Sequence, residues 1–164
     1  MNKTEFLDKY SNVYEKSPWV AERSYEKTKQ DYSFISIKEN MFQIVQQSSK
    51  NEKLKLLCNH PDLGFKRDKF DELTSHSQNE QRSAGLNSLS KKEYETFDQL
   101  NNDYKQRFKF PFILAVYEKN KFQILEIFKK RNKNSLDDEF QEAINQVHKI
   151  AEIRIKKIIL GEQN

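Results

Sequence analysis

The stretch that decides the fold runs from Ser135 to Gly161 and reads SLDDEFQEAINQVHKIAEIRIKKIILG. Its apolar residues recur every three or four positions, which is the period of an α-helix with one buried face. Ser135 is suited to cap the start of this helix, and Gly161 is suited to end it. The inward face is expected to consist of Phe140, Ile144, Val147, Ala151, Arg154 and Ile158. The sequence therefore predicts that the chain closes with its longest helix and that one arginine lies on the apolar face of that helix.

The same reading extends helices over most of the chain. Four further helices are predicted over the ranges 4–14, 51–58, 77–86 and 122–131. Three more are predicted from their start signals: one from Ser17-Pro18 towards Lys27, one from a capping box at Ser36 and Glu39, and one from a capping box at Ser90 and Glu93. Residues 61–74 are expected to form a loop with at most one helical turn. The apolar run 110–116 contains Pro111 near its start, so we expect it to be buried but not helical. The prediction is an all-α fold of seven or eight helices in a single domain, 1–164.

The composition excludes several classes of protein. The 164 residues include three glycines and three prolines, which argues against a β-rich fold with many tight turns. The net charge is +4, but basic and acidic residues are mixed along the chain. The longest basic cluster, Lys129 to Lys133, is short and is better explained as a solvated helix end. We therefore expect no nucleic-acid partner.

The single cysteine and the three histidines limit the possible sites. Cys58 follows Leu56 and Leu57, so we expect a buried thiol and no disulfide. His76 and His148 have no partner at metal-ligand spacing, so we expect no metal. No apolar stretch is long enough to span a bilayer, and neither end carries a targeting signal, so we expect a cytoplasmic protein.

The most informative polar cluster begins at His60, the first residue of the run HPDLG. Because a helix does not easily continue through the residue before a proline, His60 is expected at a helix end that faces a turn. Glu80 and Gln81 are close enough in sequence to share a cleft with this imidazole. An imidazole with an ordinary pKa of about 6.5, a carboxylate and an amide are the groups that a small-molecule lyase or hydrolase needs. From these residues alone, a hydrogen-bonded helix-end histidine remains an equally open reading of His60.

Five blocks in order along the chain resemble the family of 2-oxo-4-hydroxy-4-carboxy-5-ureidoimidazoline (OHCU) decarboxylases. The blocks are YEKSPWVAE over 14–22, HPDLG over 60–64, SQNEQ over 77–81 with Ala84-Gly85-Leu86, RFKFPFI over 107–113 after Asn101 and Tyr104, and IAEIRI over 150–155 after Glu139. Two positions depart from the family pattern. Phe65 follows the HPDLG block, and Lys109 replaces a glycine, where a positive φ would strain the backbone.

The resemblance implies a cofactor-independent decarboxylation of OHCU to (S)-allantoin in urate breakdown. It implies that His60 donates the proton stereospecifically, assisted by Glu80, and that the protein is a homodimer. The substrate ring itself can delocalise the electron pair left by CO₂, so the chemistry requires no cofactor. The substrate-binding residues implied are Pro61, Ser77, Gln81, Phe112, Ile113, Leu114, Ala115 and Val116. The last five are expected to act through their main chain.

Each candidate also has a structural reading. Glu80 can close a capping box with Ser77, Gln81 can be an exposed helix residue, and the run from Phe112 can be core packing. Trp19 and Arg154 are read as structural support, with Arg154 paired to Glu15 or Glu22. The weaker alternative for Arg154 is that it binds the substrate carboxylate. For the whole chain, the alternative function is a non-enzymatic helical interaction module that has kept the fold. A basic nucleic-acid binder is a weaker third alternative.

Overall fold

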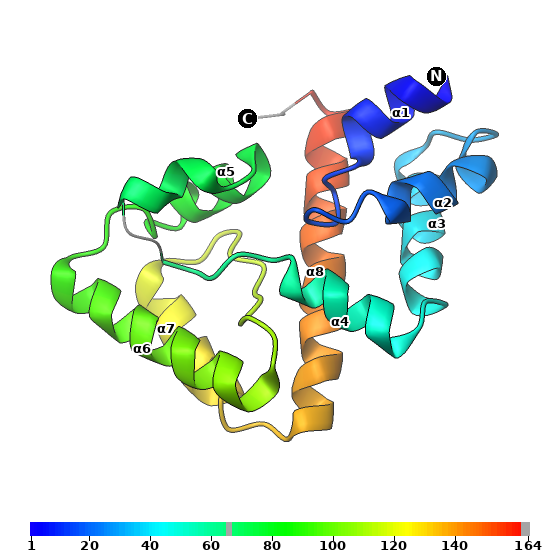
Figure 1. The fold of residues 1–164 in the computed structure, drawn as a ribbon. Helices are drawn as coiled ribbons and strands as arrows, with labels where there is room; N and C mark the ends of the chain where they lie inside the picture. The colour runs from blue at the N-terminus through cyan, green and yellow to red at the C-terminus, as the bar shows by residue number, and fades with distance from the viewer. Residues whose placement is uncertain (65–66, 162–164) are drawn as a thin grey trace.

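Helix α8, Leu136–Ile159, runs through the middle of the molecule in the computed structural model, which describes residues 1–64 and 67–161 (Figure 1). The Ser135 side chain accepts a hydrogen bond from the Asp138 amide, as an N-cap residue should. Acidic residues occupy the first turn and Lys156 and Lys157 the last, which complements the helix dipole. Gly161 follows with a φ of 76°, so the predicted start and end of this helix are confirmed.

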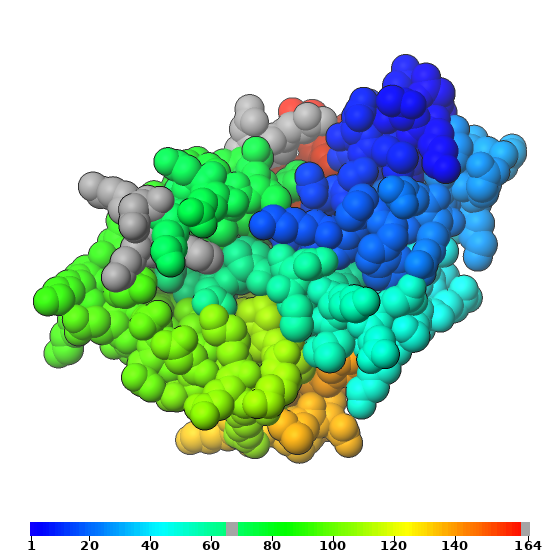
Figure 2. All heavy atoms as spheres, in the orientation of Figure 1, coloured from blue at the N-terminus to red at the C-terminus, as the bar shows by residue number. Residues whose placement is uncertain are grey.

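Seven further α-helices surround α8 in the described part of the chain. On one side lie α1 (Lys3–Tyr10), α2 (Trp19–Thr28), α3 (Phe34–Gln46) and α4 (Lys50–Cys58); on the other lie α5 (Ser75–Ser83), α6 (Lys91–Phe108) and α7 (Lys121–Arg131) (Figure 1). A short 3₁₀ helix, Arg67–Glu72, precedes α5. On the face shown in the space-filling view, the residues of the first four helices adjoin those of α5 and α6 (Figure 2). The all-α prediction is confirmed, and no described residue belongs to a strand.

Several helix starts differ from the prediction. The predicted capping box at Ser90 and Glu93 is present at the start of α6. By contrast, the N-cap residue of α3 is Ser33, three residues before the predicted Ser36. Thr74, not Ser77, caps α5, so Ser77 lies in the first turn and its hydroxyl is available for other contacts. The hydroxyl of Ser17 donates to the Glu15 carbonyl and does not cap α2. For α3 and α5 an earlier residue, Ser33 or Thr74, adopts the extended cap conformation, which local pattern alone does not decide. Pro18 precedes α2 in a helical conformation and makes no capping hydrogen bond.

Two further expectations were wrong. The first helix ends at Tyr10 and does not reach residue 14. Residues 11–16 form turns instead, and Lys16 has a φ of 48°. Cys58 is exposed, and its thiol lies 3.5 Å from the Lys109 carbonyl oxygen. Leu56 and Leu57 already occupy the inward face of α4, so the 100° rotation per residue turns Cys58 outward.

The run 110–116 is buried and non-helical, as predicted. Its main chain needs hydrogen-bond partners away from water, and side chains supply them. The Arg131 guanidinium donates to the Ile113 carbonyl at 2.5 Å, and the Gln146 side chain accepts from the Ala115 amide at 3.0 Å. Phe112 stacks on Phe128 with ring centroids 3.8 Å apart. This run is therefore held in a fixed position beside α8.

Lys109 ends α6 in the left-handed conformation, with a φ of 67° and a ψ of 20°. This is the position where the family pattern has glycine. The Cβ atom of any other residue makes this conformation unfavourable by about 1 kcal/mol or more, while glycine, which has no Cβ, adopts it freely. The strain expected from the sequence is therefore present at this helix end.

Replacing Lys109 with glycine should stabilise the protein. We expect Lys109→Gly to raise the free energy of unfolding by about 1 kcal/mol and the melting temperature by roughly 3 °C, because the strain is removed. Lys92→Gly, at an exposed position inside α6, is the matched control and should lower stability by about 1 kcal/mol. Calorimetric melting of both variants checks this; equal destabilisation by the two would contradict it.

Candidate active site

His60 lies just beyond the end of α4, where Pro61 prevents the helix from continuing. Its backbone amide donates to the Leu57 carbonyl at 3.1 Å. Its Nδ1–H donates to the Leu56 carbonyl oxygen at 3.0 Å. A carbonyl oxygen only accepts, so this bond fixes the proton on Nδ1 and leaves Nε2 with a free lone pair. The end of α4 itself therefore selects the imidazole tautomer.

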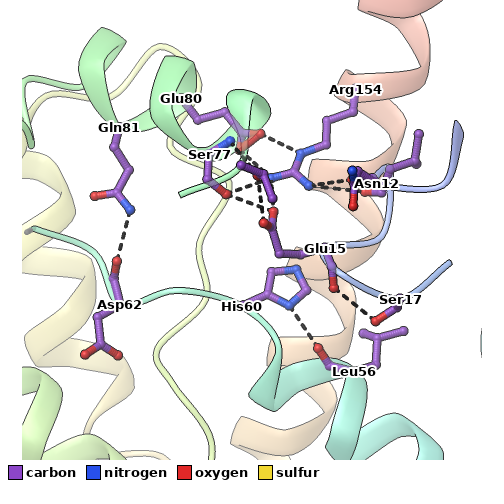
Figure 3. A network of polar contacts seen from close by, with 12 residues as sticks. Asn12, Glu15, Ser17, Leu56, His60, Asp62, Ser77, Glu80, Gln81 and Arg154 are labelled. Carbon is purple, nitrogen blue, oxygen red and sulfur yellow. Dashed lines mark hydrogen bonds and ion pairs between the residues drawn. The ribbon is translucent and has the colours of Figure 1, made fainter. Parts of the chain in front are cut away.

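Arg154 on α8 lies at the centre of a buried ionic cluster (Figure 3). Its Nε is 2.6 Å from one Glu80 oxygen, and its Nη2 is 2.8 Å from a Glu15 oxygen. Its Nη1 donates to the carbonyls of Asn12 and Val13, at 3.0 and 3.5 Å. Burial lowers the pKa of Arg154, but the two carboxylates outweigh this and raise it, so the guanidinium stays charged.

The charge of Arg154 affects His60. Burial lowers the pKa of His60 to about 4, and the Arg154 cation adds to this lowering. Glu15 and the bond to Leu56 act in the opposite direction but do not compensate. In the free protein at neutral pH the imidazole is therefore uncharged, with Nε2 as a base.

The residues predicted from the sequence surround one small cavity. Its lining includes most of the predicted site residues: His60, Pro61, Ser77, Glu80, Gln81, Phe112, Ile113, Leu114, Val116 and Arg154. Leu63 and Ile150, which the sequence did not suggest, complete the wall. Ser77, Glu80 and Gln81 reach it together because positions i, i+3 and i+4 share one helix face. The cavity volume is about 30 Å³, the space of one water in the liquid.

Two predicted residues lie outside this cavity. Ala115 lines a neighbouring groove of about 800 Å³, which shares Glu80, Val116 and Ile150 with the cavity. Trp19 packs against the core from α2, with the Arg23 guanidinium over its ring. Phe65, the other departure from the family pattern, is outside the described residues.

Glu80 and Gln81 have partners that differ from the expected ones. The carboxylate of Glu80 binds Arg154, while the tautomer of His60 is set by the Leu56 carbonyl. Gln81 is buried; its amide accepts from the Gly64 amide at 3.0 Å and donates to the Asp62 carbonyl at 2.9 Å. Gln81 therefore holds the loop that follows His60. Among the described residues, no three His, Cys, Asp or Glu side chains gather as metal ligands would, and no helix is long and apolar enough to cross a bilayer.

Glu15 is the residue of this site that sequence reasoning missed. It was considered only as one of two possible partners for Arg154. Both of its carboxylate oxygens accept hydrogen bonds, from the Thr74 hydroxyl at 2.7 Å and the Ser77 hydroxyl at 2.8 Å. The sequence feature that could have identified Glu15 is its place in the block YEKSPWVAE. It lies there between the buried Tyr14 and Lys16, whose positive φ turns the chain.

Comparisons with known proteins give matches over nearly the whole chain. A family model described as OHCU decarboxylase matches residues 1–156. A Haloferax volcanii protein named 2-oxo-4-hydroxy-4-carboxy-5-ureidoimidazoline decarboxylase is 39% identical over 158 residues, which is 96% of this chain and 90% of that protein. A "Uric acid degradation bifunctional protein" from Bacillus sp. (strain TB-90) is 41% identical over the whole chain, which covers 32% of that protein.

Solved structures give the same result for the fold. The crystal structure of an (S)-allantoin synthase superposes with a TM-score of 0.76 at 32% identity, covering 96% of this chain and 50% of that one. A crystal structure of an OHCU decarboxylase in the presence of (S)-allantoin superposes with a TM-score of 0.73. Its sequence identity is 20%, so this second likeness concerns the fold alone.

His60 should remain neutral in the folded protein at pH 6. Its pKa of about 4 predicts that the imidazole gains a proton only as the pH falls towards 4, whereas an ordinary histidine titrates near 6.5. An NMR titration of the histidine ring shifts measures this directly. The His60→Asn spectrum assigns the signal, and a His60 midpoint near 6.5 would contradict the geometry described above.

Proposed function

The chain belongs to the OHCU decarboxylase family and converts OHCU to (S)-allantoin in urate degradation, and we propose that His60 carries the proton that completes this reaction. The observation that supports this role is the free Nε2 of a neutral imidazole at the wall of the cavity. A base with a fixed tautomer can accept a proton from one substrate atom and return it to the next.

Arg154 is proposed to bind the substrate carboxylate. All three nitrogens of its guanidinium are engaged in the free protein, by Glu80, Glu15, Ser77 and two main-chain carbonyls. A substrate carboxylate must therefore replace one of these partners. The Glu80 side chain is 22% exposed and borders the large groove, whereas that of Glu15 is 1% exposed. Glu80 is the partner that can leave, so it assists the reaction by holding the guanidinium until the substrate arrives.

The cavity must also widen when the substrate binds. A volume of about 30 Å³ does not hold a substituted five-membered ring. Movement of Glu80 towards the adjoining groove of about 800 Å³ would both enlarge the cavity and free the guanidinium. The main chain over 112–116 is proposed to read the polar edges of the ring, and Ser77 and Pro61 complete the pocket.

The proposed steps balance in atoms and charge. The bond between the ring carbon and its carboxylate breaks, and CO₂ leaves. The electron pair forms a double bond to the adjacent ring carbon, the C=N bond of that carbon opens onto its nitrogen, and this nitrogen takes a proton from solvent. The hydroxyl on the same carbon then gives its proton to Nε2 of His60 and becomes a carbonyl. The imidazolium donates this proton to the adjacent carbon, which carries the ureido arm. Delivery from one face of a fixed ring produces a single enantiomer.

Replacing His60 with asparagine should lower the rate of (S)-allantoin formation by roughly 10²-fold or more, the usual contribution of a general acid–base group. Circular dichroism of the product during turnover measures rate and enantiomer together. His76→Asn, a half-buried histidine outside the cavity lining, is the control and should stay near the wild-type rate. Retained activity in His60→Asn would remove His60 from the mechanism, and an inactive wild-type protein would favour the interaction-module alternative.

We also propose that the protein acts in the cytoplasm as a homodimer. The resemblance to the family is the argument for the dimer, and two exposed aromatic side chains beside the groove, Tyr117 and Phe122, are compatible with a partner surface. Light scattering of the purified protein should give a mass near twice the 19.7 kDa of one chain. A mass of one chain at micromolar concentration would contradict this part of the proposal.

A further inference from the structure

We infer that Glu15 is a positioning residue for this reaction, because it anchors Arg154 and Ser77 in the places where they meet the substrate carboxylate. The inference rests on the proposed role of Arg154. Glu15 does not line the cavity, so it acts through the two residues that do.

The anchoring role follows from the contacts of Glu15. One oxygen accepts from the Thr74 hydroxyl, and the other accepts from both the Ser77 hydroxyl and Nη2 of Arg154 (Figure 3). One carboxylate therefore joins the first turn of α5 to the C-terminal third of α8. Charge-assisted hydrogen bonds of this kind are short and directional, so they fix the orientation of the guanidinium plane.

The position of Glu15 is itself fixed by its own chain segment. The neighbouring carbonyls of Asn12 and Val13 accept from the same guanidinium, and the Ser17 hydroxyl closes a turn onto the Glu15 carbonyl at 3.0 Å. The side chain of Asn59 donates to the Lys16 carbonyl at 3.1 Å. Because Asn59 precedes His60, the segment that positions Arg154 also contacts the end of the helix that positions the imidazole.

The two carboxylates on Arg154 have different roles in this arrangement. Glu15 stays ionised. Burial raises its pKa, but Arg154 and the hydroxyls of Thr74 and Ser77 together outweigh burial and bring the pKa of Glu15 below its ordinary value. With Glu15 in place, the guanidinium keeps a countercharge when Glu80 leaves. Without Glu15, Glu80 is the last carboxylate on a buried cation, and the substrate has to displace it against a larger electrostatic cost.

Glu15→Gln should therefore raise KM for OHCU by roughly 10- to 100-fold, the range that corresponds to one charge-assisted hydrogen bond. We expect kcat to change by less than about threefold, because the carboxylate loses its charge as CO₂ leaves and Arg154 stabilises the bound substrate more than the transition state. The inhibition constant of (S)-allantoin should stay within about threefold of wild type, since the product has no carboxylate. A shift in KM without a shift in product affinity is a result that a merely structural role would not give.

Three controls make the test decisive. Glu15→Asp keeps the charge and should recover part of the KM; it also replaces Glu15→Gln if that variant does not fold. Ile37→Val, a change in the core on α3, shows how a small loss of stability alone affects turnover. In an Arg154→Gln background, Glu15→Gln should cause no further rise in KM, because the two residues act through one contact.

Two results would overturn the inference while leaving the family reaction intact. The first is an unchanged KM in Glu15→Gln with normal turnover. The second is a parallel rise of KM and of the (S)-allantoin inhibition constant, which would mean that the whole site is distorted. Failure of the wild-type protein to form (S)-allantoin would instead overturn the proposed function on which the inference rests.

Discussion

The buried guanidinium of Arg154 is the group on which the rest of the site depends. Moving an unpaired cation from water into the protein interior costs several kcal/mol, so this side chain is tolerated only because carboxylates and carbonyls surround it. Those partners come from the segment after α1 and from α5, while Arg154 itself belongs to α8. The need to satisfy one cation therefore draws together three parts of the chain that are far apart in sequence, and the cavity lies where they meet.

The same cation connects binding to proton transfer. Arg154 is suited to attract a substrate carboxylate, and its positive charge adds to the effect of burial, which lowers the pKa of His60 and keeps the imidazole uncharged before the substrate arrives. In the proposed reaction the substrate carboxylate takes the place of Glu80 on the guanidinium, so the field at the imidazole changes little when the substrate binds. Under this proposal His60 meets the substrate as a neutral base that can take the hydroxyl proton. A histidine with an ordinary pKa would already be partly protonated and would compete with the substrate for negative partners.

Much of the fold could be predicted from the sequence, because helix positions depend largely on local sequence patterns. The apolar period of α8, its Ser135 cap and the capping box at Ser90 are short-range features, and each was found where predicted. The starts of α3 and α5 were misplaced because Ser33 and Thr74 compete with Ser36 and Ser77 for the same role, and only the backbone conformation decides between them. Glu15 was not recognised as a site residue because its contacts are with Thr74, Ser77 and Arg154, and no local pattern records such distant contacts.

A second buried arginine shows why the first is more than a structural element. Arg131 pairs with the fully buried Glu139 and donates to the Ile113 carbonyl, so it supports the main chain of the cavity wall. A buried ion pair is weak evidence for stability, since apolar residues of similar size often stabilise a core as well or better. Arg131 has a structural role, because the Ile113 carbonyl lies in a buried, non-helical run and needs a hydrogen-bond donor. Arg154 also donates to carbonyls, those of Asn12 and Val13, and pairs with two carboxylates. What distinguishes Arg154 is that it borders the cavity and that one of its partners, Glu80, is accessible from the groove. A cation with one permanent and one exchangeable carboxylate is an arrangement suited to receive a third.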